Sequence, residues 1–189
     1  MTNNDVLRRT RYIFNLNDKK MIEIFGLSGA KVTREEVSDW LKRDDDPDYK
    51  SLSDTNLASF LNGFITKKRG KKEGLLPEPE KKLNNNNVFM KLKIALSLKA
   101  EDVLDLLLLA DFRMSKHELS AFFRKPGHKH YRECKDQILR NFLKGIQLKY
   151  HVEKDTAKPN ENKKSRPQKT SASNADNSSE KKSVYQWKK

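Results

Sequence analysis

The stretch ASFLNGFITK, residues 58–67, returns 82 positions later as RNFLKGIQLK, residues 140–149. Around both stretches, apolar side chains recur at the i, i+3, i+4 and i+7 spacing of one helix face. This spacing predicts two equivalent amphipathic helices, which we expect over about 54–68 and 136–150.

Each of these predicted helices keeps an internal glycine, Gly63 in the first and Gly145 in the second. A glycine inside a helix costs about 0.5–1 kcal/mol relative to alanine. Its presence in both stretches favours another helix that approaches too closely for a Cβ atom, with a ligand backbone in that space as the alternative.

The similarity extends well beyond the two helices. The same shift of 82 positions aligns residues 3–69 with residues 85–151 without a gap. Unrelated amphipathic segments can share apolar patterning, but a gap-free register over this length indicates an internal duplication. The identical pairs include Val6 and Val88, Leu16 and Leu98, Leu27 and Leu109, Glu36 and Glu118, Tyr49 and Tyr131, Asp54 and Asp136, and Phe60 and Phe142.

The duplication predicts how the chain is organised. We expect repeat 1 over residues 1–70, a linker over 71–83, and repeat 2 over 84–150. Residues 151–189 contain few apolar side chains and many Lys, Asn and Ser, so they cannot bury enough surface to offset the entropy of ordering. We therefore expect a disordered tail, in which Tyr185 and Trp187 are the only large aromatic side chains.

Apolar periodicity within each repeat predicts four helices. In repeat 1 they are expected over about 4–15, 18–26, a third segment that begins near residue 33, and 54–68. The predicted fold class is all-α: two tandem pseudo-equivalent four-helix repeats, followed by a disordered basic tail. The pattern leaves open whether the two repeats share one core.

The third helix of each repeat has a clear start signal. Thr33 is followed by Glu36, and Ser115 by Glu118, at the spacing of a capping box. Capping accounts for both glutamates, so they are not predicted to be catalytic carboxylates. Asp18 is a candidate N-cap for the second helix of repeat 1.

Composition limits the cellular setting. The formal net charge is +14, which favours nucleic acid or another polyanion as a partner. One cysteine, Cys134, allows no intrachain disulfide, and the N-terminal MTNNDVLRRT lacks an apolar signal core. The apolar run from Leu106 to Ala110 is far too short to span a bilayer, so no membrane association and a cytoplasmic location are expected.

The chain resembles a known family. The resemblance rests on NN-x-VL near the start, V-T-x-x-E at 32–36, SDTNLASFLNGFITKKRG at 53–70 and YRECKDQILRNFLKGI at 131–146. These motifs are similar to the YehS family of bacterial proteins, whose domain has no known function. The resemblance covers about residues 2–151 and implies a bacterial, cytosolic, helical protein, with no activity, substrate or cofactor attached.

The repeats differ most in one segment. DDDPDYKSLSD, residues 44–54, is acidic, whereas its counterpart PGHKHYRECKD, residues 126–136, is basic. Lysine and arginine beside a tyrosine can contact phosphate and stack on a base, although the matching of Tyr49 and Tyr131 favours a structural anchor in both repeats. We predict a non-enzymatic nucleic-acid-binding protein that uses RNA or DNA as its partner. The expected contact residues, which we call the basic cluster, are Arg113, Lys116, Arg124, Lys125, Lys129, Tyr131 and Arg132.

The opposite charges permit a second interpretation. The acidic segment of repeat 1 can pair with the basic segment of repeat 2, either within one chain or between chains. The latter would make the protein an interaction or homo-oligomerisation module. The acidic residues that would make these pairs are Asp44, Asp45, Asp46 and Asp48.

Catalytic and metal chemistry are not expected. His117, His128, His130 and Cys134 lie close in sequence, but their spacing matches no zinc pattern and repeat 1 has no such set. Cys134 aligns with Leu52, which indicates a small buried thiol. No nucleophile elbow, P-loop or dinucleotide fingerprint occurs, so we predict no catalytic residues, no metal and no cofactor.

Overall fold

Eight helices form the regular structure of the described residues, which are 1–71, 74 and 76–156 of this computed structural model. Repeat 1 contains α1 (Asn3–Ile13), α2 (Asp18–Leu27), α3 (Arg34–Leu41) and α4 (Asp54–Arg69). Repeat 2 contains α5 (Asn85–Ala95), α6 (Ala100–Leu109), α7 (Lys116–Ala121) and α8 (Asp136–Thr156).

The helices repeat in register. Each helix of repeat 2 begins 82 positions after its counterpart in repeat 1. The all-α class and the two tandem four-helix repeats are therefore confirmed. None of the described helices combines the length and the apolar character that crossing a bilayer would require.

The last helix is longer than expected. The sequence placed its end near residue 150, whereas α8 continues to Thr156 and enters the segment predicted to be disordered. No glycine or proline lies between Gly145 and Pro159, so helix propagation is not interrupted there. The rest of the predicted tail, including Tyr185 and Trp187, lies outside the described residues.

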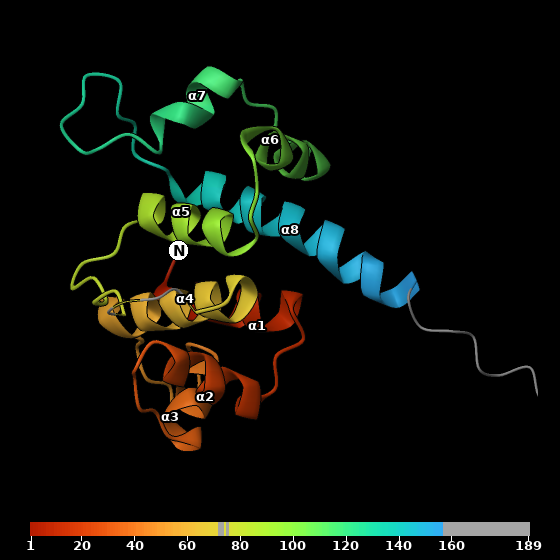
Figure 1. The fold of residues 1–189 in the computed structure, drawn as a ribbon. Helices are drawn as coiled ribbons and strands as arrows, with labels where there is room; N and C mark the ends of the chain where they lie inside the picture. The colour runs from red at the N-terminus through yellow and green to blue at the C-terminus, as the bar shows by residue number, and fades with distance from the viewer. Residues whose placement is uncertain (72–73, 75, 157–189) are drawn as a thin grey trace, which may run out of the picture. The chain divides into compact units, whose positions relative to one another are not determined.

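The two repeats share one core, a point that the sequence pattern left open. Helix α4 of repeat 1 packs against α5 of repeat 2, and α8 of repeat 2 packs against α1 of repeat 1. Helices α2 and α3 cover the outer side of the α1–α4 pair, and α6 and α7 cover the outer side of the α5–α8 pair (Figure 1).

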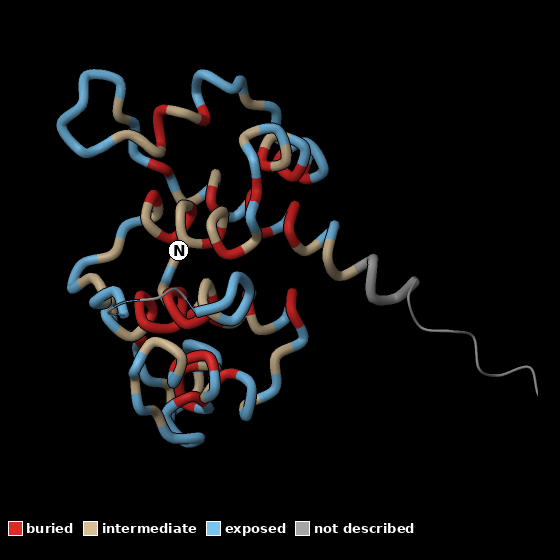
Figure 2. Tube along the Cα trace, viewed as in Figure 1, coloured by how far each residue is buried: buried red, intermediate tan, exposed pale blue. Residues whose placement is uncertain are grey.

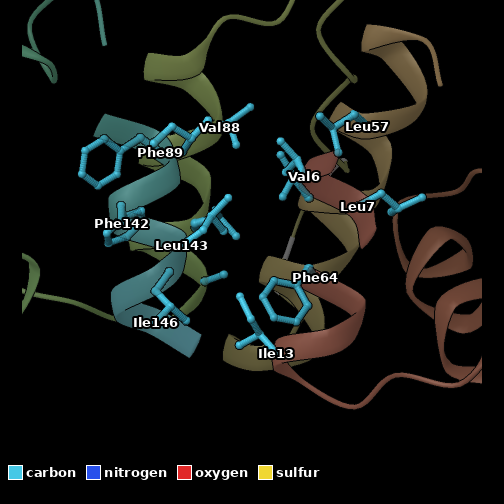
Figure 3. Packing of buried hydrophobic residues seen from close by; sticks show 14 of the residues in the cluster. Val6, Leu7, Ile13, Leu57, Phe64, Val88, Phe89, Phe142, Leu143 and Ile146 are labelled. Carbon is cyan, nitrogen blue, oxygen red and sulfur yellow. The ribbon is translucent and has the colours of Figure 1, made fainter. Parts of the chain in front are cut away.

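Burial follows this layered arrangement. Buried positions line the inner faces of the helices, while the loop between α7 and α8 is mostly exposed (Figure 2). Figure 3 shows Val6 and Val88, which are equivalent residues of the two repeats, pointing into the space between the two central helix pairs. Both valines belong to a single apolar cluster that includes residues of every helix.

The two internal glycines mark close helix contacts, as predicted. A Cβ atom on Gly63 would lie 1.7 Å from the backbone oxygen of Ile24 in α2. A Cβ atom on Gly145 would lie 1.9 Å from the backbone oxygen of Leu106 in α6. Because the obstacle is backbone in both cases, only glycine lets α4 pack this closely on α2, and α8 on α6.

The capping boxes are also confirmed. The Thr33 hydroxyl accepts from Glu36 N at 3.1 Å, and Ser115 accepts from Glu118 N at 3.2 Å, while each glutamate accepts from the cap backbone N–H. The prediction for α2 was wrong by one residue. Its N-cap is Asn17, whose side-chain oxygen accepts from the backbone N–H of Lys20. Asp18 is the first residue inside the helix.

A pair of crossed contacts ties each repeat to the other. Asp54, the first residue of α4, accepts from the backbone N–H of Leu83, just before repeat 2. Asp136, the first residue of α8, accepts from the amino group of Met1, the residue equivalent to Leu83. The exchange is reciprocal, so the repeats are related by an approximate two-fold arrangement.

Candidate functional site

Two equivalent loops connect the third and fourth helices of the repeats. We call residues 42–53 the acidic loop and residues 122–135 the basic loop. A buried asparagine in the first helix of each repeat holds the loop in place. In repeat 1, the Asn4 amide donates to the carbonyls of Trp40 and Lys50 at 2.9 and 2.8 Å, and accepts from Leu52 N at 2.9 Å.

Repeat 2 has the same clamp. Asn86 donates to the carbonyls of Phe122 and Arg132 at 2.9 and 2.8 Å, and accepts from Cys134 N at 2.9 Å. Sequence reasoning used the paired asparagines only as part of a family motif. Their presence at equivalent positions before apolar helices was the signal for a structural role.

The acidic loop is held by a buried carboxylate. Asp39, at the end of α3, accepts from Lys50 Nζ at 2.7 Å and from Lys42 Nζ at 3.0 Å. Hydrogen bonds hold the pKa of Asp39 below its ordinary value, with the larger effect from Lys50 and the smaller from Lys42. Lys42 also reaches Asp48 at 3.0 Å, so one lysine joins the helix end to the loop.

A second ion-pair system lies beside the first. Arg8 of α1 contacts Asp5 at 2.8 Å and Asp44 at 3.1 Å, and donates to the carbonyl of Lys42 at 2.5 Å. Desolvation of the guanidinium opposes the charged form, but hydrogen bonds from Arg8 to Asp5 and then Asp44 leave its pKa raised. Arg8 therefore ties the acidic loop to α1.

The acidic residues find their partners inside repeat 1. Asp44 and Asp48 pair as described, Asp45 pairs with Arg43 at 3.3 Å, and Asp46 accepts from the backbone N–H of Asp48 at 3.0 Å. Within the described residues, none of them pairs with the basic loop, so the intrachain version of the second interpretation is wrong. Asp44, Asp45 and Asp48 thus neutralise nearby cations of their own repeat. The version between chains stays a prediction.

The equivalent positions of repeat 2 keep the cations and lose the carboxylates. Arg124 and Arg132 stand where Lys42 and Lys50 stand in repeat 1, but Ala121 replaces Asp39. The other replacements remove both Arg8 and its loop partner. The full set is Met90 for Arg8, Pro126 for Asp44, Gly127 for Asp45, His128 for Asp46 and His130 for Asp48.

The basic cluster is consequently short of anionic partners. Across the part of the chain that the structure describes, Arg113, Lys125, Lys129 and Arg132 are exposed and form no ion pair. Lys116 differs, because its Nζ lies 2.5 Å from Glu101 Oε1. The structure thus groups the loop cations on one exposed segment, with Arg113 and Lys116 near the start of α7 (Figures 1 and 2).

Histidines share the basic loop. The ring of His130 lies 5.6 Å from that of His128 and 6.5 Å from that of His117, measured between centroids. A guanidinium nitrogen of Arg124 lies 3.3 Å from His128 Nε2. Within the described residues, no three His, Cys, Asp or Glu side chains are arranged to hold a metal ion.

The half-buried residues of the cluster face a pocket. Tyr131 and Arg124 lie at the edge of a hollow of about 410 Å³ where α4, α5 and the basic loop meet. Residues from both repeats therefore form its walls. They include Asn62 and Ile65 of α4, Asn87, Met90, Lys91 and Ile94 of α5, and Phe123 and Pro126 of the loop.

A polar group lies inside this hollow. Lys91 Nζ contacts Asn62 Oδ1 at 2.5 Å and Glu80 Oε1 at 2.8 Å, with its side chain only 12% exposed. Among the described residues, Glu80 Oε2 is buried and has no hydrogen-bond partner. Sequence reasoning missed all three residues, because Asn62 shares its helix face with another polar residue, Ser59, and gave no local signal.

Cys134 is a structural thiol, as predicted. Its side chain is buried, and burial raises the pKa of the thiol to about 12. The thiol therefore stays protonated at neutral pH and is a poor nucleophile.

Comparison with known proteins identifies relatives over both repeats. The family described as "Protein of unknown function (DUF1456)" matches residues 3–70 and 85–151. The "Uncharacterized protein YehS" of Escherichia coli (strain K12) is 44% identical over 155 residues, which are 82% of this chain and 99% of the relative. No solved structure matches the chain. The chain therefore belongs to the YehS-like DUF1456 family, whose domain it carries twice in tandem.

Proposed function

We propose that this protein is a non-enzymatic nucleic-acid-binding protein that contacts the phosphate backbone through the basic loop of repeat 2. The observation that carries the proposal is the replacement of Asp39 by Ala121. Repeat 1 neutralises its loop cations with a buried carboxylate. Repeat 2 keeps two cations at the equivalent positions but lacks this carboxylate, so an external anion can pair with them.

Phosphate suits this position chemically. Arginine, which replaces both lysines in repeat 2, presents a planar fork of donors that matches phosphate oxygens. The hydrogen bond from Asn86 holds the backbone carbonyl of Arg132 in place, so the backbone that carries the Arg132 side chain is fixed before binding. A rigid loop loses less entropy on binding than a disordered one.

The remaining cations extend the surface. Lys125 and Lys129 are exposed on the same loop as the two arginines, Arg113 is exposed just before α7, and each can meet a further phosphate. Five such contacts would give log K a slope of about −3.5 against log salt for a single strand. Cytoplasmic location belongs to the same proposal and is supported by the sequence, which has one cysteine and therefore no intrachain disulfide.

The test restores the missing carboxylate. Ala121→Asp would let Arg124 and Arg132 pair internally, as Lys42 and Lys50 do in repeat 1. We expect weaker binding of a fluorescent single-stranded oligonucleotide by anisotropy, and a salt slope reduced by about 1.4 because two contacts are lost. Asn17→Asp is the matched control, since it adds the same charge at an N-cap where Asp and Asn are equivalent.

Two results would contradict the proposal at different levels. If the wild type binds no oligonucleotide at low salt, the proposed function is wrong. If it binds, but neither Ala121→Asp nor a triple reversal of Arg124, Lys125 and Lys129 to Glu changes the salt slope, the basic loop is not the site. The triple variant changes only exposed or half-buried side chains, so it guards against misfolding of the first variant.

A further inference from the structure

We infer that the pocket between α4, α5 and the basic loop receives one unstacked base of a single-stranded nucleic acid. The inference rests on the proposed function and adds the class of substrate. The pocket and the basic loop are continuous, because Arg124 and Tyr131 belong to both. A phosphate on the loop therefore places its own or the neighbouring nucleotide at the mouth of the pocket.

The open pocket arises from the divergence of the repeats. In repeat 1, Arg8 extends from α1 to the acidic loop and binds Asp44 and the carbonyl of Lys42. In repeat 2, Met90 and Pro126 replace the arginine and the aspartate, and neither can form this bridge. Met90 instead lines the pocket as an apolar and adaptable side chain.

The walls have the character that the faces of a base require. Met90, Ile94 and Ile65 are apolar, Phe123 and Tyr131 are aromatic, and all five line the pocket. Aromatic and apolar walls stack on any base because every base has a π-face. The volume of about 410 Å³ lies within the usual range of about 300–1,000 Å³ for small-ligand sites.

Polar groups within the pocket suit the edge of a base. Lys91 and the Asn62 and Asn87 amides supply donors and acceptors, and Glu80 Oε2 is an acceptor that has no partner within the described part of the chain. A buried acceptor left unpaired is unfavourable, so a ligand N–H that reaches it gains binding strength. The amino and imino groups of bases are such donors, and the half-exposed Glu80 side chain lines the pocket that they would enter.

Single strands are favoured over duplexes for a geometric reason. A paired and stacked base cannot enter a lateral pocket, whereas a single strand can turn a base outward at little cost. A binder that used the loop cations alone would respond only to phosphate density.

The experiment separates the base from the phosphates. Anisotropy titrations of the wild-type chain at low salt would use an RNA strand, a DNA strand, an abasic strand and a duplex, all of equal length. We expect at least one base-containing single strand to bind about tenfold more tightly than the abasic strand, which lies within the range expected for one stacked base. The RNA and DNA strands identify which sugar is preferred.

A variant of Met90 tests the pocket itself. Met90→Arg restores the residue of repeat 1, fills the hollow and adds a positive charge. We expect it to lose the tenfold preference while its affinity for the abasic strand stays the same or rises. A general loss of structure would weaken both, so the opposite responses are diagnostic. Met90→Leu conserves volume and apolar character and should keep the preference.

The outcomes distinguish this inference from the proposed function. If the abasic strand binds as tightly as the strands with bases, the base pocket is refuted and the phosphate site stands. If Met90→Arg keeps the full preference for bases, the pocket is also refuted. If no strand binds, the proposed function fails and the inference fails with it.

Discussion

The substitution Gly63→Ala offers the sharpest test of the packing between α2 and α4. A Cβ atom at this position would lie 1.7 Å from the backbone oxygen of Ile24, whereas real Cβ contacts stay beyond about 3.0 Å. The two helices must therefore separate locally by at least about 1.3 Å, the difference between these distances. The backbone of α2 cannot turn aside as a flexible side chain could.

The expected magnitude combines two opposing effects. Alanine improves helix propensity by up to about 1 kcal/mol. Overpacking a core typically costs about 1–3 kcal/mol, and a clash with backbone belongs at the upper end of that range. We therefore expect the free energy of unfolding to fall by about 2 kcal/mol, which corresponds to a decrease in Tm of roughly 4–8 °C for a chain of this size. Gly145→Ala should behave alike, because its obstacle is the equivalent Leu106 oxygen.

The chain contains its own control. Gly26 is an exposed glycine in α2, and outside its own helix backbone and chain neighbours no described atom lies within 4 Å of the place where its Cβ would stand. Gly26→Ala should raise the free energy of unfolding by about 0.5–1 kcal/mol through propensity alone. Urea unfolding followed by circular dichroism, with m-values compared between variants, measures all three changes. If Gly63→Ala proved as stable as Gly26→Ala, the close approach of α2 and α4 would be refuted.

Three further predictions follow from hydrogen bonds and burial. Asn86→Ala should cost about 3 kcal/mol in urea unfolding, because it leaves buried backbone groups of the basic loop unpaired, and a cost below 1 kcal/mol would contradict the clamp. Hydrogen bonds from Asn3, and to a lesser extent from Leu83 N, lower the pKa of Asp54. The stability that the Asp54 carboxylate contributes is therefore complete above the ordinary pKa of 3.8. It is lost as the pH falls through the lowered pKa of the folded state. Unfolding of Asp54→Asn should accordingly depend less on pH below about 4 than that of the wild type, and identical pH profiles would refute the assignment. Cys134 should react with a thiol reagent only as fast as the chain unfolds, and rapid labelling of the native protein would contradict its burial.

Local features were predictable from the sequence, because their causes lie within one turn or one helix face. The capping boxes at Thr33 and Ser115 depend on a residue three positions away, and the amphipathic faces depend on periodicity. The duplication itself needed only a comparison of the chain with itself. Gly63 was interpretable because its retention in both repeats opposes helix propensity.

Contacts between repeats were not predictable in the same way. Asn62 and Lys91 meet only because α4 packs on α5, and no local pattern specifies that packing. The pocket was missed for this reason. The loss of the Asp39 carboxylate at Ala121 was visible in the aligned repeats, but its meaning required the geometry of Lys42 and Lys50.

The crossed packing of the repeats bears on how the two loops came to differ. A repeat standing alone would carry both contact surfaces, and pairing with an identical copy would bury them in an isologous homodimer. In such a homodimer every substitution appears twice, so a neutralised loop and a cationic loop cannot coexist. Fusion into one polypeptide keeps the partners at high effective concentration and frees each half to change by itself. In the tandem chain, one half can therefore specialise while the other is preserved as a scaffold. A homodimer of identical repeats does not allow this.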